Sequence, residues 1–203
     1  MNTLLKNSAA AARPLLSRPE VLAWIHGQSP SVRSRAAEQE LARDLGIDCA
    51  KNQQWTGAFG EQIVREALEA QGHRVRRPQH RRGLQPDWMT DYALYEVKTQ
   101  LYSGSGSAAD LVYAAPVKYG DMPRVWGRPL NIVLLGRAED RYRGLLSGPR
   151  GSFLMSFIEL CRAHDIYFVS GRALVGSARS NKVLLFLGKG LQQRPRECLC
   201  HLL

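Results

Sequence analysis

The sequence has few cysteines, and they are not spaced as in a disulfide-rich or zinc-binding fold. The 203-residue chain contains four of them: Cys49, Cys161, Cys198 and Cys200. Four are too few for a disulfide framework at this length, so we expect free thiols in a reducing compartment, the cytoplasm. The stretches "CRAH" and "CLCH" lack paired Cys-x-x-Cys spacing, which leaves zinc binding by these cysteines and His164 as an open alternative.

Long apolar runs and acidic residues are also scarce. No uninterrupted apolar run approaches the roughly 20 residues needed to cross a bilayer, so we expect no membrane partner. Asp and Glu number 18 against 28 Lys and Arg, and 22 of those cations are Arg. Because Arg binds phosphate through a planar fork of donors, this excess favours a polyanionic partner, with nucleic acid ahead of a membrane surface.

Acidic residues are absent altogether from residues 1–19, which are rich in Ala, Leu, Ser and Arg. This composition is typical of an organellar transit peptide, and an ordinary basic arm has the same composition. We therefore keep organellar targeting as the alternative to a cytoplasmic location.

The pattern over residues 1–50 predicts a small helical appendage. Two helices are expected, over 18–27 and 29–47, with Ser29 or Ser31 as a cap for the second. The rest of the chain has a different pattern, so we place a domain boundary near residue 50.

Residues 51–203 predict one α/β domain. It begins with an amphipathic helix in which Phe59, Ile63 and Ala67 recur at helical spacing, and Gly72 ends that helix. The segment "HRVRRP" then predicts a short strand, and the basic loop "QHRRGLQ" follows it.

The second half of this domain alternates apolar runs with a helical pattern. The runs at 131–136 and 182–188 are typical of strands covered on both faces, and 166–170 predicts a further short strand. A helix is expected over 153–165. Its apolar face is predicted to contain three residues at i, i+4 and i+8: Phe153, Phe157 and Cys161. The predicted fold is a mixed central sheet flanked by helices.

The segment "ALYEVKTQL" places Glu96 and Lys98 on one face of a predicted strand, with Val97 on the other. "PDWM" predicts the antiparallel partner strand, joined by the turn "TD", and this hairpin would bring Asp87 beside Glu96. A solvated strand face carries the same alternation of charged residues, so that alternative remains open.

Two adjacent carboxylates repel unless a cation lies between them, so Asp87 and Glu96 indicate a metal site. Hard oxygen ligands suit Mg²⁺, with Mn²⁺ as a substitute. Beside a metal-bound water, Lys98 could orient or deprotonate the nucleophile, or neutralise charge developing on a phosphate. Glu61, expected in the first turn of the preceding helix, adds a third acid.

These segments resemble the PD-(D/E)XK nuclease superfamily, which has the restriction-endonuclease-like fold, over about residues 56–136. Pro86 and Asp87 match the PD, Glu96 and Lys98 match the E-x-K, and Glu61 is similar to the helical glutamate of many members. The resemblance implies a Mg²⁺-dependent phosphodiesterase acting on DNA. It also implies four catalytic residues: Glu61, Asp87, Glu96 and Lys98. The three acids among them are the implied metal ligands.

A type II restriction-like endonuclease, acting as a homodimer on double-stranded DNA, is the function we expect from this resemblance. A junction-resolvase-like repair or recombination nuclease and a catalytically silent DNA-binding subunit are the alternatives. Candidate DNA-binding residues are basic side chains before and after the catalytic motif: Arg81, Arg82, Lys118 and Arg124. For Arg81 and Arg82, the alternative is that they are exposed to solvent and have no role in DNA binding.

Overall fold

The computed structural model describes residues 14–28, 34–46, 55–103, 108–149 and 151–180. Several features expected from the sequence lie outside these ranges: the strand over 182–188, the helix caps Ser29 and Ser31, and Cys49, Cys198 and Cys200. None of the helices within them combines the length and apolar character needed to cross a membrane.

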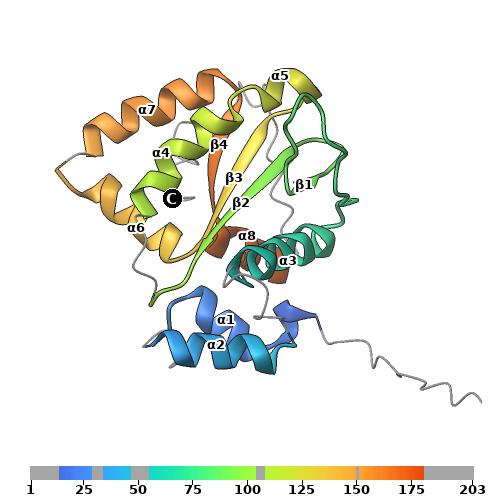
Figure 1. Cartoon of the computed structure of the whole chain (residues 1–203), viewed down its shortest axis with the longest axis vertical. Helices are drawn as coiled ribbons and strands as arrows, with labels where there is room; N and C mark the ends of the chain where they lie inside the picture. Colours follow the sequence, from blue (N-terminus) through green and yellow to red (C-terminus); the bar gives the residue numbers. More distant parts are fainter. Residues whose placement is uncertain (1–13, 29–33, 47–54, 104–107, 150, 181–203) are drawn as a thin grey trace, which may run out of the picture.

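The centre of the molecule is a four-stranded mixed sheet with the order β1-β2-β3-β4 (Figure 1). The strands are β1 (Trp88–Met89), β2 (Leu94–Gln100), β3 (Leu130–Gly136) and β4 (Ile166–Ser170). β1 is antiparallel to β2, whereas β2, β3 and β4 are parallel. The hairpin and the strands near 131–136 and 166–170 are therefore confirmed. The chain is an α/β protein whose mixed sheet is flanked by helices.

Helices cover both faces of the sheet (Figure 1). One face packs against α3 (Trp55–Ala70) and α8 (Gly171–Arg179). The other packs against α4 (Ala108–Tyr119), α6 (Arg137–Ser147) and α7 (Gly151–Ala163), with the short α5 (Met122–Trp126) between α4 and β3. The apolar periodicity of the sequence predicts α3 and α7, whereas α4, α6 and α8 are not expected from it.

Strand β3 lies between two hydrophobic cores. All seven of its residues are buried, as its continuous apolar run predicts. Ile132 and Leu134 belong to the core beneath α4, α6 and α7, whereas Val133 and Leu135 belong to the core beneath α3 and α8. The alternation of side chains along one strand thus supplies both faces of the sheet.

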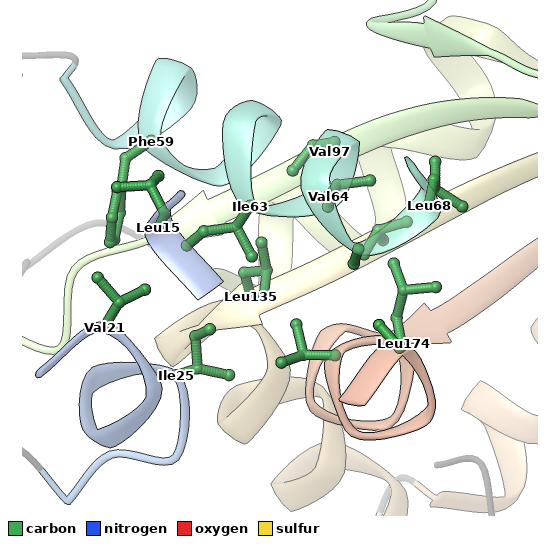
Figure 2. Packing of buried hydrophobic residues seen from close by; sticks show 14 of the residues in the cluster. Leu15, Val21, Ile25, Phe59, Ile63, Val64, Leu68, Val97, Leu135 and Leu174 are labelled. Atoms are coloured by element: carbon green, nitrogen blue, oxygen red, sulfur yellow. The ribbon is translucent and has the colours of Figure 1, made fainter. Parts of the chain in front are cut away.

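The N-terminal helices share the second of these cores. η1 (Leu15–Ser17) contributes Leu15 and α1 (Pro19–Ile25) contributes Val21 and Ile25, which pack beside α3 (Figure 2). α2 (Arg35–Asp44) adds Leu41 and Ala42 to the same core. The helix α2 is capped by Ser34, whose side chain accepts a hydrogen bond from Ala37 N at 3.1 Å. Ser29 and Ser31, the residues expected as caps, lie outside the described residues. Ser34 acts as the cap of α2 because its extended backbone places its hydroxyl at the helix start.

Two further expectations are corrected. The strand expected at "HRVRRP" is reduced to one antiparallel bridge between Arg76 and Met89. In α7 the expected Cys161 is buried, together with Leu154 and Ile158, and the expected Phe157 is partly buried against the same core. Phe153, in contrast, is 70% exposed. The expectation is therefore wrong for Phe153 alone, because the apolar residues of α7 extend around more of the helix than its neighbours cover.

Candidate active site

The β1–β2 hairpin fixes the relative position of the two predicted carboxylates. A turn in which Thr90 N donates to Ala93 O at 2.9 Å closes the hairpin. Trp88 pairs with Tyr95 and Met89 with Leu94, and this register continued by one residue sets Asp87 opposite Glu96. Val97 N also donates a 2.7 Å hydrogen bond to Asp87 Oδ2, which orients the Asp87 side chain across the hairpin.

Glu96 is a buried carboxylate paired with Lys98. Lys98 Nζ lies 2.7 Å from Glu96 Oε1, while Val97 packs in the core on the opposite face. Glu96 is only 4% exposed, so the alternative of a solvated strand face is wrong for this residue. Its second oxygen, Oε2, is buried and has no hydrogen-bond partner among the described residues. A buried carboxylate oxygen normally has a partner, and a hard cation would supply one.

The surroundings of Asp87 raise the pKa of its carboxyl. Burial raises the pKa of its carboxyl from 3.8 to about 7, and the negative charges of Glu96 and Glu61 add to the rise. The hydrogen bond from Val97 N and the charge of Lys98 oppose it. A divalent cation at this site would favour the ionised form of Asp87, because its charge offsets both the burial of that carboxylate and its repulsion by Glu96.

Tyr119, at the end of α4, covers the Lys98 side chain. The ammonium nitrogen lies 5.0 Å from the centre of the Tyr119 ring, within the range of a cation–π interaction. Burial and the negative charge of Glu96 raise the pKa of Tyr119, so its hydroxyl remains protonated at neutral pH. Lys98 is thus held between a carboxylate and an aromatic ring.

Glu61 reaches the site from α3. Helix α3 begins at Trp55, so Glu61 lies in the second turn of the helix and the expectation of the first turn is wrong. Gly60 allows α3 to approach β2 closely, because a Cβ at Gly60 would overlap with the Thr99 side chain. Burial is the main cause that raises the pKa of Glu61, and the charge of Glu96 contributes.

The Glu61 carboxylate forms an ion pair with Arg77. The described residues contain no group of three or more His, Cys, Asp or Glu arranged to hold a metal ion. Asp87 and Glu96 therefore form a pair, and Glu61 stands beside them with its own cation. The assignment of Glu61 as a metal ligand stays a prediction.

The predicted DNA-binding residues lie around the loop between Pro78 and Asp87 and around α5. Arg82 is exposed and has a positive φ of 51° at the tip of the loop. The Arg81 guanidinium lies 5.9 Å from the centre of the Trp126 ring, which connects the loop to α5. Arg124 of α5 is exposed and pairs with Asp121 at 3.1 Å, and Lys118 is exposed at the end of α4.

Two residues of this site were missed by the sequence reasoning. Arg77 is one of several arginines in a basic stretch, and no local pattern distinguishes it from its neighbours. Tyr119 lies 21 residues after Lys98 in the sequence, and no local pattern indicates their contact. Both contacts join segments that only the folded chain brings together.

Within the described residues, nothing supports the alternative of a zinc site. Cys161 is a buried free thiol, and burial raises its pKa. His164 is exposed three residues further along. A raised thiol pKa disfavours the thiolate that binds zinc.

Comparison of the chain with models of known protein families, with curated protein sequences and with solved structures found no match. The site must therefore be interpreted from its own residues.

Proposed function

We propose that this protein is a Mg²⁺-dependent DNA endonuclease, most similar in function to the type II restriction enzymes. The observation that supports the proposal best is the buried Glu96, paired with Lys98 at 2.7 Å and set opposite Asp87 across the hairpin. A structural ion pair would need only one carboxylate. The second carboxylate, Asp87, has a pKa raised to about 7, so its ionised form destabilises the metal-free protein. A bound cation would stabilise that ionised form, and raised pKa values of this kind are typical of functional sites.

The residues of the site divide into two roles in this proposal. Asp87 and Glu96 would hold the metal ion, and Glu96 Oε2 is the buried oxygen that lacks another partner. When bound, Mg²⁺ would supply Lewis-acid charge to the phosphate and lower the pKa of a bound water. Lys98, fixed by Glu96 and by the Tyr119 ring, would orient the attacking water and neutralise charge on the reacting phosphate.

The order of elements supports assignment to the restriction-endonuclease-like fold. Helix α3 contributes Glu61, the β1–β2 hairpin contributes Asp87, Glu96 and Lys98, and α4 and β3 follow. This order agrees with the resemblance to the PD-(D/E)XK superfamily, in which the helical glutamate precedes the hairpin. The fold family remains our proposal.

The proposed substrate is double-stranded DNA. The net charge of +10 favours a polyanion, and Arg81, Arg82, Lys118 and Arg124 are all exposed on segments adjoining the site. A phosphate backbone that reached Lys98 would pass close to these segments. A homodimer would suit cleavage of both strands, as expected for a restriction-like enzyme.

The test is incubation of the purified chain with plasmid, linear duplex, single-stranded and branched DNA, in Mg²⁺ and in EDTA. Discrete duplex fragments in Mg²⁺ alone would support the restriction-like function, and selective cutting of branches would support the resolvase alternative. Binding without a product would instead favour the silent subunit. Glu96→Gln is the control, since it keeps the shape of the side chain and removes its charge; a variant that cuts like the wild type would refute the assignment.

A further inference from the structure

We propose that Arg77 acts as a built-in second cation of the site, so that the site takes one divalent metal ion and not two. This inference rests on the proposed function, because it concerns the same carboxylates. Arg77 follows α3 in sequence and was not among the residues expected to act at the site. Three contacts hold its guanidinium there.

The first contact is the ion pair between Arg77 Nη2 and Glu61 Oε2. The second is a cation–π contact with Trp88, whose ring centre lies 5.3 Å from the Arg77 guanidinium carbon. The third is a 3.5 Å hydrogen bond from Arg77 Nε to the backbone oxygen of Asp87. Trp88 is itself fixed, because its Nε1 donates to Glu61 O at 2.8 Å.

These contacts direct a permanent positive charge at the third carboxylate. A guanidinium is charged at every relevant pH, and its planar fork matches a carboxylate in geometry. While Arg77 pairs with Glu61, the charge of that carboxylate is offset and its Oε2 has a partner. Glu96 also has a cation, Lys98, on Oε1, but its buried Oε2 has no hydrogen-bond partner among the described residues. Asp87 and Glu96 are then the carboxylates left for a metal ion.

A count of charges favours one ion. A metal ion binds the ionised form of these carboxylates, and in that form Glu61, Asp87 and Glu96 carry −3 together. Lys98 and Arg77 carry +2, so the site as a whole carries −1. One divalent ion changes this to +1, which matches the single negative charge of a phosphodiester. A second ion would leave +3 in a partly buried site, which is unfavourable because charges of one sign repel strongly there.

The test counts Mn²⁺ ions bound to the DNA-free protein by electron paramagnetic resonance and isothermal titration. The wild type should bind one Mn²⁺ per chain, and Asp87→Asn should remove that site. Arg77→Met keeps an apolar stem over Trp88 and removes the charge. It should create a second Mn²⁺ site or tighten the first by about fivefold or more. Arg77→Lys, which keeps the charge, should bind one ion.

Arg65→Met is the matched control. Arg65 also lies over Trp88, at 5.6 Å, but its ion pair is with Glu69, at 2.8 Å. The Arg65→Met variant should therefore bind one ion with the affinity of the wild type, although it too loses one positive charge beside the Trp88 ring.

Two equivalent Mn²⁺ ions on the wild type, or an Arg77→Met variant indistinguishable from Arg65→Met, would overturn the role of Arg77 and leave the nuclease proposal standing. A wild type with no Mn²⁺ site sensitive to Asp87→Asn would overturn the proposed function itself. Thermal melting of each variant in EDTA shows whether it is folded before binding is measured.

Discussion

Replacing Asp87 by Asn should stabilise the metal-free protein at neutral and alkaline pH. The asparagine side-chain oxygen can still accept the hydrogen bond from Val97 N, which is 2.7 Å long in the wild type. What disappears is the negative charge that burial and Glu96 disfavour. The variant therefore separates the charge of Asp87 from its shape and its main backbone contact.

The pH dependence follows from the raised pKa. The Asp87 pKa is about 7 in the folded chain against an ordinary value of 3.8, so the folded state retains a proton that the unfolded state releases. The associated stability is fully present below about pH 3.8 and is lost as the pH rises through 7. A rise of this size corresponds to roughly 4 kcal/mol. Because Asp87 is only partly buried, relaxation and entering water should reduce the measured gain to about 2 kcal/mol.

The assay is urea unfolding of wild type and Asp87→Asn in EDTA at several pH values between 4 and 9. The two proteins should differ little at pH 4, and the variant should be more stable by about 2 kcal/mol at pH 8 and above. Added Mg²⁺ should stabilise the wild type, by about 2.7 kcal/mol at 100 times its Kd, and the variant much less. Asp91→Asn, an exposed residue in the same hairpin, is the control and should show neither effect.

A different result would refute this reasoning. If Asp87 is only a turn or capping residue, Asp87→Asn should lose about 1 kcal/mol at every pH and keep the full response to Mg²⁺. A variant that behaves in this way and still cuts DNA would exclude the paired carboxylates as a metal site.

Three other predictions concern activity and binding. Lys98→Ala should lower DNA cleavage by orders of magnitude while binding in Ca²⁺ is nearly unchanged, since the lysine acts on the reacting water; cleavage at the wild-type rate would contradict its role. Tyr119→Leu should lower the cleavage rate about tenfold, because it removes the ring 5.0 Å from Lys98 Nζ. Tyr119→Phe keeps the ring and should retain most of the rate. Equal rates for the two variants in single-turnover assays would show that the ring has no part in cleavage. Replacing both Arg81 and Arg82 by Ala should weaken binding to all duplex sequences alike and reduce the slope of log affinity against log salt by at most about two; a loss confined to one sequence, measured by fluorescence anisotropy, would make them base-reading residues.

The local parts of the site could be predicted because they depend on short stretches of chain. Alternation along a strand places Glu96 and Lys98 together and Val97 opposite them, whatever the rest of the fold. A turn at Thr90 and Asp91 sets the hairpin and, with it, the register that brings Asp87 opposite Glu96. Apolar periodicity likewise indicates α3 and α7, and a continuous apolar run indicates β3.

What the sequence by itself determined is therefore the secondary structure of the central elements and the face on which each charged residue projects. Only the tertiary structure decided that this face is buried, because α4 brings Tyr119 over Lys98 from a distant part of the chain. It also decided that Arg77 captures Glu61 and that Phe153 stays exposed. Local geometry fixes the direction of a side chain, whereas its burial and its partners depend on long-range packing, which no short pattern encodes.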